Sequence, residues 1–125
     1  MLCTGCFDIL HVGHLYYLKA AKYLGDMLVV GVTGDDYISK GPGRPVFLEE
    51  QRAFMLEELR CVDVVKIYHE KIPYDLISKI KPSVYAKGSE YRGKLPEQEL
   101  VESLGGRCEF IDTPVYSSTK LLEVL

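Results

Sequence analysis

The sequence predicts an α/β protein: a single doubly wound, Rossmann-like domain around a five-stranded parallel sheet. Short apolar runs alternate with segments of helical periodicity along the chain of 125 residues. One of those runs, residues 27–32 (M-L-V-V-G-V), is apolar without alternation, as expected for a strand buried on both faces of a parallel sheet. The hydrophobic content of 47% is sufficient for one ordinary core, so we expect residues 1–125 to form one domain.

Strands and helices are expected in strict alternation. We expect strands at residues 1–4, 27–32, 62–68, 83–86 and 107–111, and helices at 14–24, 48–60, from Pro73 onward, at 96–104 and at 118–125. Leu15 and Leu18 are expected on the buried face of the first helix, and Leu48 and Leu56 on that of the second. Residues 33–45 are expected to form a loop with at most a short helical turn. Right-handed crossovers then connect these elements into one sheet, for which we expect the strand order 3-2-1-4-5.

Composition and charge exclude several classes of protein. The formal net charge is −3 and the 15 Lys and Arg residues are spread along the chain, so no general basic field for nucleic acid is expected. No apolar run reaches the length of about 18 residues that a membrane span needs, and the N-terminus lacks a basic region followed by an apolar stretch. We therefore expect a cytoplasmic protein. Reduced core cysteines are expected at Cys3, Cys6, Cys61 and Cys108.

The segment with the clearest chemistry is the first loop, G-C-F-D-I-L-H-V-G-H from Gly5 to His14. Ligands of doubly wound sheets sit beyond the carboxyl ends of the strands, and this loop leaves the first strand and enters the first helix. Backbone N–H groups and the helix dipole make such an entry an anion site. His11, just before the helix, and His14, in its first turn, add donors on the same side, and Gly13 leaves room for a phosphate. Nucleotidyl transfer needs mainly positioning and charge neutralisation, so this loop is predicted to hold reacting phosphates.

Four further segments accompany this loop. They are L-V-V-G-V-T-G-D-D after the first helix, K-G-P-G-R-P-V-F-L-E-E-Q-R from Lys40 to Arg52, A-K-G-S-E-Y from Ala86 to Tyr91, and Y-S-S-T-K from Tyr116 to Lys120. Together with H-V-G-H they resemble the HxGH nucleotidyltransferase superfamily, and within it the cytidylyltransferase-like family. The chain is most similar to the adenylyltransferase domain of bacterial heptose-phosphate enzymes, which make ADP-heptose. The resemblance covers nearly the whole chain.

This resemblance implies roles for individual residues. His11, His14 and Lys40 would be catalytic. The histidines would hold the triphosphate and stabilise the transition state at the α-phosphorus, and Lys40 would reach the α-phosphate or the incoming phosphate oxygen. The residues that the resemblance implies for nucleotide binding are Gly5, Cys6, Phe7, Asp8, Gly13, Arg52, Lys87, Gly88, Glu90, Tyr116, Ser117, Ser118 and Thr119.

The nucleotide-binding residues have different expected contacts. The backbone N–H groups of Cys6 and Phe7 would bind a phosphate with Asp8 beside them, and Arg52 would contact a phosphate from the second helix. The cluster at 117–119 would cap the last helix and hold the β- and γ-phosphates, a role that hydroxyl groups at a helix start also favour physically. Simpler interpretations stay open: a solvated Lys40, an ion pair of Arg52 with Glu49 or Glu50, and an N-cap at 117–119. For His11 and His14 the simpler interpretation is a helix-capping residue and an exposed histidine.

The resemblance also implies the reaction, which is transfer of the NMP moiety of an NTP to a phosphorylated small molecule with release of pyrophosphate. ATP is favoured over CTP, because the arginine that glycerol-3-phosphate cytidylyltransferases carry before the last helix is missing between Asp112 and Thr119. The K-G-S-E-Y stretch favours a sugar 1-phosphate of the heptose type, while Val115 replaces a glycine usual in both groups. Mg²⁺ is expected with the triphosphate and not in a metal site of the protein. No nucleic-acid or membrane partner is expected, and a homodimer is left open.

Several alternatives stay open at the level of sequence. Within the family they are a CTP-dependent cytidylyltransferase of the glycerol-3-phosphate or phosphoethanolamine type, and an adenylyltransferase similar to FAD synthase. A different class is a zinc module with Cys3, Cys6, His11 and His14 as ligands, or a redox C-x-x-C pair. Against zinc, Cys3 is expected within a strand and Cys6 just past its end, so their side chains need not converge. A nucleotide-binding module without catalysis is the last alternative.

Overall fold

Five parallel strands form the sheet that the sequence predicts. The structure is a computed structural model that describes residues 1–38 and 41–112. Its strands are β1 (Leu2–Gly5), β2 (Val29–Thr33), β3 (Val64–Tyr68), β4 (Val84–Gly88) and β5 (Arg107–Ile111). They are ordered β3-β2-β1-β4-β5, and every neighbouring pair is parallel. The predicted fold class and strand order are therefore confirmed.

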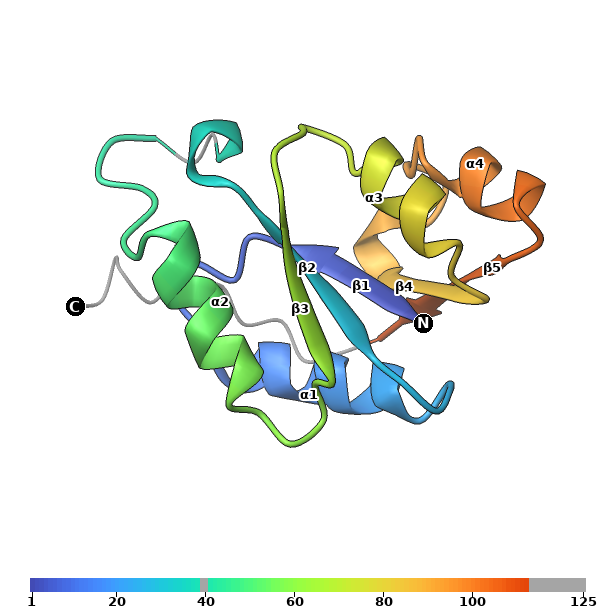
Figure 1. Ribbon diagram of the computed structural model, residues 1–125, viewed down its shortest axis with the longest axis horizontal. Helices are drawn as coiled ribbons and strands as arrows, with labels where there is room; N and C mark the ends of the chain where they lie inside the picture. The colour runs from blue at the N-terminus through green and yellow to red at the C-terminus, as the bar shows by residue number, and fades with distance from the viewer. Residues whose placement is uncertain (39–40, 113–125) are drawn as a thin grey trace.

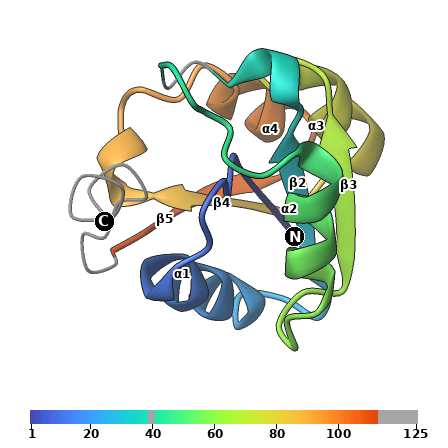
Figure 2. The ribbon, with the colours of Figure 1, turned by 90° about the vertical axis from the view of Figure 1, so that its left-hand side faces the viewer.

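Helices cover both faces of this sheet (Figure 1). The helices α1 (Val12–Lys22) and α2 (Glu49–Glu57) lie on one face, and α3 (Tyr74–Ile80) and α4 (Gln98–Ser103) lie on the other (Figure 2). Two 3₁₀ turns, η1 (Asp35–Tyr37) and η2 (Ser89–Tyr91), follow β2 and β4. The helix expected at 118–125 lies outside the described residues. Because the chain winds outward from the central β1 in both directions, the switch point of the sheet lies between β1 and β4.

Each face of the sheet has its own apolar core. The core beneath α1 and α2 includes Cys3, Leu18, Val30, Val32 and Leu56, and the core beneath α3 and α4 includes Leu2, Ile77, Tyr85, Leu95 and Val101. Successive residues of β1 and β2 therefore face opposite cores, which explains why the run at 27–32 needs no polar alternation. The same alternation decides which side of the sheet each site residue faces.

Three positions predicted to be buried are exposed instead: Leu15 is 40% exposed, Leu48 is 60% exposed, and Met27, which precedes β2, is 55% exposed. Helix α1 begins at Val12, earlier than expected, and its buried stripe runs through Leu18, which turns Leu15 outward. Leu48 precedes α2 as its N-cap, and the buried face of that helix begins with a charged side chain, Arg52. The pattern of apolar residues could not reveal this inward arginine.

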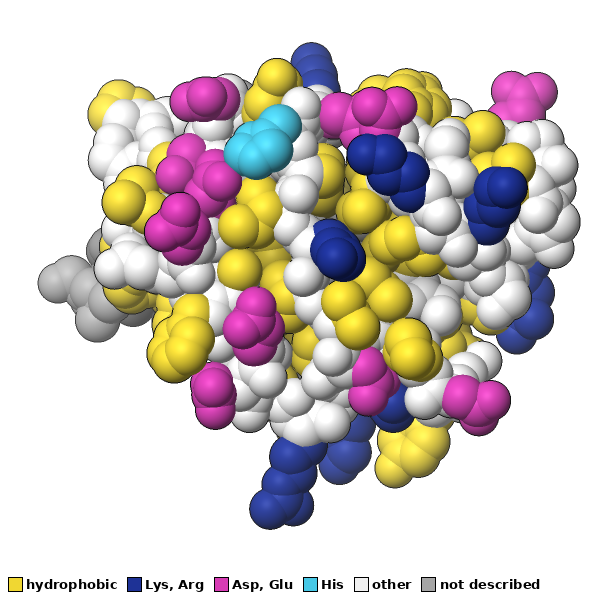
Figure 3. Space-filling model, viewed as in Figure 1, with side chains coloured by type: hydrophobic (Ala, Val, Ile, Leu, Met, Phe, Trp, Pro, Cys, Tyr) yellow, Lys and Arg dark blue, Asp and Glu magenta, His cyan; other side chains and the backbone are white. Residues whose placement is uncertain are grey.

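The molecular surface carries both signs of charge. On the face shown in Figure 3, acidic and basic side chains are interspersed among apolar ones. Among residues 1–38 and 41–112, no helix combines the length and the apolarity that crossing a bilayer requires.

Candidate active site

The loop between β1 and α1 leaves the carboxyl end of the central strand and carries the H-V-G-H motif. Phe7 within this loop has a φ of 50°, in the left-handed region that costs energy for a residue with a side chain. Its ring turns back onto Gly5, where an added Cβ would stand 3.0 Å from Phe7 Cε2. A left-handed residue in a turn can aim successive backbone N–H groups to one side, as backbone anion sites do. The geometry suits the phosphate contact of Cys6 and Phe7, which stays a prediction.

His11 and His14 form a stacked pair at the start of α1, which we call the histidine pair. Their ring centroids are 3.8 Å apart and their planes are inclined by 23°. The Gly13 N–H donates to His11 Nδ1 at 3.1 Å, and the His11 N–H donates to His14 Nδ1 at 3.2 Å. The two side chains therefore cap the helix reciprocally. The Phe7 ring meets His14 edge-on, with a centroid distance of 5.2 Å.

This capping also fixes the position of the hydrogen on each imidazole. A ring nitrogen that accepts a hydrogen bond carries no hydrogen, so each neutral ring has its N–H at Nε2. Both Nε2 atoms are then donors on rings that are held together at the positive end of a helix. Both histidines therefore cap the helix, and capping is compatible with phosphate binding because it orients the donors. Their contact with phosphate stays a prediction.

Asp8 belongs to this loop, and its buried side chain anchors the loop to another segment. Its carboxylate is completely buried and accepts hydrogen bonds from the N–H groups of Val46 at 2.8 Å and Phe47 at 3.0 Å. The Arg44 side chain is its salt-bridge partner. Burial by itself raises the pKa of this carboxyl group, but the Phe47 and Val46 N–H groups and Arg44 outweigh it and lower the pKa. Asp8 therefore ties the segment that follows Lys40 to the H-V-G-H loop.

The structure does not support the phosphate contact predicted for Arg52, because its guanidinium is fully buried and bonded to the protein. Nε donates to the Phe47 carbonyl at 2.9 Å, and Nη2 donates to Asp35 Oδ1 at 2.7 Å. Nη1 donates to two carbonyls, those of Cys6 at 2.8 Å and Thr33 at 2.7 Å. The planar guanidinium fork suits such bridging. Arg52 therefore fastens the loops after β1 and β2 to the start of α2, and its ion pair is with Asp35 and not with the neighbouring glutamates.

Replacing Arg52 with lysine should weaken the fold although the positive charge is kept. A lysine ammonium cannot span four acceptors in one plane, and each buried carbonyl left without a donor costs about 1–3 kcal/mol. We expect R52K to lower the free energy of unfolding by about 2 kcal/mol or more, measured by urea denaturation. Arg60→Lys, at an exposed position just past α2, is the matched control and should change stability little. Equal stability of the two variants would contradict this bridging role of Arg52.

The end of β4 brings Lys87, Gly88 and Glu90 to the same edge of the sheet. Lys87 Nζ lies 3.3 Å from the Thr4 carbonyl oxygen and 4.4 Å from the centroid of the Tyr91 ring. An added Cβ at Gly88 would stand 2.5 Å from the Glu90 carboxylate oxygens, so glycine lets that carboxylate fold back against the strand end. Nucleotide contact by these residues stays a prediction.

Five of the predicted site residues lie outside the described residues: Lys40, Tyr116, Ser117, Ser118 and Thr119. Their assigned roles stay predictions.

Sequence reasoning missed a group of buried polar side chains beneath the carboxyl edge. Tyr68 and Thr33 share a hydrogen bond of 2.7 Å. The Tyr85 hydroxyl lies between Thr4 Oγ1 at 2.8 Å and Glu97 Oε2 at 2.7 Å. Threonine and tyrosine in a strand are typical of ordinary β structure, and nothing in their spacing distinguishes a hydrogen-bonded side chain from a merely packed one. Glu97 gave no signal either, because a glutamate near a helix start is common.

The geometry does not support the zinc alternative. Cys3 is completely buried in β1, and burial raises the pKa of its thiol to about 12, whereas a metal ligand must be a thiolate. Both Nδ1 atoms of the histidine pair already accept backbone hydrogen bonds. Within the described ranges, no three His, Cys, Asp or Glu side chains gather as metal ligands do. The same buried thiol argues against a reactive C-x-x-C pair.

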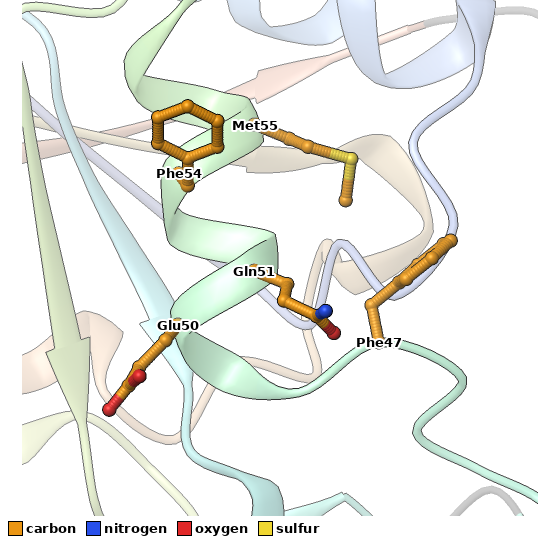
Figure 4. Close-up of a pocket in the computed structure, with 5 residues that line it drawn as sticks. All are labelled: Phe47, Glu50, Gln51, Phe54 and Met55. Carbon is orange, nitrogen blue, oxygen red and sulfur yellow. The ribbon is translucent and has the colours of Figure 1, made fainter.

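A separate hollow lies beside α2. It has a volume of about 410 Å³ and is lined by Phe47, Glu50, Gln51, Phe54 and Met55. Figure 4 shows the lining residues of α2 together with Phe47, which precedes the helix. None of these lining side chains is cationic, so the hollow does not suit a triphosphate.

A doubly wound sheet with paired histidines at its first helix is the architecture of an HxGH nucleotidyltransferase, and comparisons with known proteins agree. Residues 2–123 match the cytidylyltransferase-like family. The chain is 44% identical over 124 residues to the bifunctional protein HldE of Syntrophotalea carbinolica, covering 96% of this chain and 25% of that protein. It is 50% identical over 113 residues to the bifunctional protein HldE of Sulfurimonas denitrificans, covering 83% and 24%.

A solved structure is also similar. The lipopolysaccharide core biosynthesis protein from Thermoplasma volcanium has a TM-score of 0.73 and 34% identity, covering 93% of this chain and 96% of that one. The chain therefore belongs to the cytidylyltransferase-like family, and it is a nucleotidyltransferase. The resemblance found in the sequence is confirmed. The chain spans about a quarter of the length of these HldE relatives.

Proposed function

We propose that residues 1–125 form a catalytic domain that transfers the NMP moiety of an NTP, with ATP favoured, to a sugar 1-phosphate of the heptose type. Pyrophosphate is the second product. The observation that carries this proposal is the histidine pair, whose capping hydrogen bonds orient two Nε2 donors at the start of α1. Transfer at an α-phosphorus requires charge stabilisation and alignment, and donors oriented in advance need no reorganisation during the reaction.

In this mechanism the triphosphate lies across the H-V-G-H loop. The N–H groups of Cys6 and Phe7 bind one phosphate, and both imidazoles donate to oxygens at the α-phosphorus. An oxygen of the acceptor phosphate forms the new P–O bond while the bond between the α-phosphorus and the β-phosphate oxygen breaks, so no covalent enzyme intermediate is needed. Mg²⁺ enters as part of the Mg·NTP substrate, since the Asp8 carboxylate is bonded to the protein and offers it no cage. Lys40 and residues 117–119 complete the predicted site.

The choice of acceptor is supported by one sequence motif and by the proteins to which the chain is similar. The K-G-S-E-Y stretch at Lys87–Tyr91 fits the heptose type, and the HldE relatives cover most of this chain. The solved relative is named for lipopolysaccharide core biosynthesis, and a saccharide core is assembled from activated sugars. A nucleoside triphosphate substrate also favours the cytoplasm as the place of the proposed reaction.

Pyrophosphate release from defined substrate pairs tests the proposal. ATP and CTP are each combined with sugar 1-phosphates including heptose 1-phosphate, with glycerol 3-phosphate, with phosphoethanolamine and with FMN. We expect ATP with heptose 1-phosphate to give the highest kcat/KM. Release from CTP with glycerol 3-phosphate or phosphoethanolamine would replace the proposal by a cytidylyltransferase, and release from ATP with FMN by an FAD-synthase-like enzyme. Nucleotide binding without release from any pair would indicate the module without catalysis.

A further inference from the structure

Lys87 and Thr4 face each other across the switch point of the sheet. The register of β1 and β4 pairs Cys3 with Ala86, and its continuation sets Thr4 beside Lys87. Lys87 Nζ donates to the Thr4 carbonyl at 3.3 Å and to Thr4 Oγ1 at 3.5 Å. The crevice between two such strands is where doubly wound sheets bind their ligands. Lys87 is therefore a cation placed at a ligand-binding crevice.

Lys87 lies on the opposite side of the sheet from α1 and its histidine pair. Tyr85, two residues earlier on the same strand, belongs to the core beneath α3 and α4, and alternate residues of a strand share a face. Thr4 lies on that side too, because an added Cβ at Gly31 would meet both Thr4 Cγ2 and a side-chain carbon of Leu76 in α3. Figure 2 shows α1 on the other side of the sheet. The site therefore has the histidine pair on the side of α1 and the Lys87 ammonium on the side of α3 and α4.

A directional chain of hydrogen bonds connects Lys87 to a buried carboxylate. The Tyr85 hydroxyl donates to Glu97 Oε2 at 2.7 Å. Because its single hydrogen is used there, Thr4 Oγ1 must be the donor in the contact of 2.8 Å with Tyr85. Thr4 Oγ1 then accepts from Lys87. The chain thus runs from an ammonium through two hydroxyls to Glu97, which is 5% exposed.

Glu97 offsets part of the effect of burial on Lys87, and the Lys87 ammonium has more donors than its contacts with Thr4 use. Burial lowers the pKa of Lys87, and the Glu97 carboxylate is the largest of the influences that raise it again. An ammonium has three N–H donors, and its hydrogen-bond acceptors among the described residues are the two oxygens of Thr4. The Tyr91 ring lies 4.4 Å from Nζ and is attracted to the cation through its π face. Tyr91 is 42% exposed, so this end of Lys87 lies near the surface.

We propose that Lys87 binds the phosphate of the acceptor, and that Thr4, Tyr85 and Glu97 hold this lysine charged and in position. The inference rests on the proposed function. In nucleotidyl transfer the attacking and leaving oxygens lie roughly in line across the α-phosphorus. With the triphosphate held from the α1 side, the attacking oxygen approaches from the side of α3 and α4, where Lys87 lies. The ligand class is a phosphate monoester, and Lys87 is thereby moved from the nucleotide contacts that the sequence implies to the acceptor.

Steady-state kinetics of Lys87→Met and Lys87→Arg separate acceptor binding from nucleotide binding. We expect K87M to raise the KM for the acceptor by about tenfold or more, with the KM for the nucleotide nearly unchanged, because one charge-assisted contact is lost. K87R should restore part of the acceptor KM. Glu97→Gln keeps an acceptor for Tyr85 but removes the charge, so it should raise the acceptor KM less. Glu99→Gln, exposed in α4 two residues further along, is its matched control and should leave both KM values unchanged. A K87M variant that changes only the nucleotide KM, or neither, would overturn the proposal.

A binding measurement keeps the inference testable even if no substrate pair turns over. Inorganic phosphate is titrated calorimetrically into wild-type protein and into K87M, each saturated with α,β-methylene ATP so that the triphosphate site is filled. We expect phosphate binding to the wild-type protein and at least a tenfold weaker affinity for K87M. Equal affinities would reject the role of Lys87 whatever the kinetic result. If no substrate pair turns over but phosphate binding still depends on Lys87, only the proposed reaction is rejected.

Discussion

Replacing His14 with asparagine should remove most of the activity while leaving the fold intact. The asparagine Oδ1 can take the place of Nδ1 as acceptor for the His11 N–H, so the cap on α1 is kept. It has no donor at the position of Nε2, where the proposed mechanism needs one. Loss of one oriented donor to developing charge costs about 3 kcal/mol, so kcat should fall by about two orders of magnitude. Pyrophosphate release and thermal unfolding measure the two effects.

His14→Gln makes the opposite change, because it keeps the donor and loses the acceptor. The longer glutamine side chain carries an amide N–H toward the position of Nε2 but provides no acceptor where Nδ1 stood. H14Q should therefore keep more activity than H14N while losing about 1 kcal/mol of stability, the contribution of a typical helix cap. His14→Ala loses both groups and should combine the two defects. Wild-type kcat in H14N would exclude a transition-state role for this imidazole, whereas equal defects in H14N and H14Q would show that capping and catalysis are inseparable here.

The fold could be predicted from the sequence because its signals are local. The apolar run at 27–32 identifies a strand buried on two faces, and the alternation of strands with helices leaves few topologies once crossovers are right-handed. The errors were equally local in origin. Leu15 and Leu48 are apolar and correctly spaced, yet one faces away from the buried stripe of α1 and the other precedes α2. Periodicity identifies a helix better than it fixes its first residue.

The site was predictable only where its residues are close in sequence. His11 and His14 cap one helix, so their proximity follows from their spacing. Arg52 has its partners in three separate segments, and no local pattern distinguishes a buried bridging arginine from a phosphate ligand. The contacts of Asp8 with Val46 and Phe47 likewise join positions 38 and 39 residues apart. Contacts of that range depend on the tertiary fold.

Neutralising Asp8 should cause the largest loss of stability among these variants. Asparagine has nearly the same shape but cannot balance the charge of Arg44, whose side chain is only 4% exposed. Removing one partner of a buried ion pair costs about 3–5 kcal/mol, because the remaining charge loses the attraction that offset its desolvation. We expect D8N to lower the free energy of unfolding by about 3 kcal/mol in urea denaturation. Glu109→Gln breaks an exposed pair with Arg107 and should change it little.

The pH dependence gives this prediction a second measurement. The pKa of Asp8 is lower in the folded protein than its ordinary value, so its carboxylate stabilises the fold fully above the unfolded pKa of about 4. That stability is lost as the pH falls from there through the folded pKa. Wild-type protein should therefore lose stability on acidification below about pH 4, and D8N should lose less over the same range.

A double variant separates the charge of Asp8 from its two backbone hydrogen bonds. D8N with Arg44→Gln removes both charges, so its loss of stability should be smaller than the sum of the two single losses. Because Asp8 also holds Val46 and Phe47 against the H-V-G-H loop, D8N protein that is still folded should bind nucleotide more weakly than E109Q. If D8N matched E109Q in stability, in acid response and in nucleotide affinity, Asp8 would not be the anchor between the two loops.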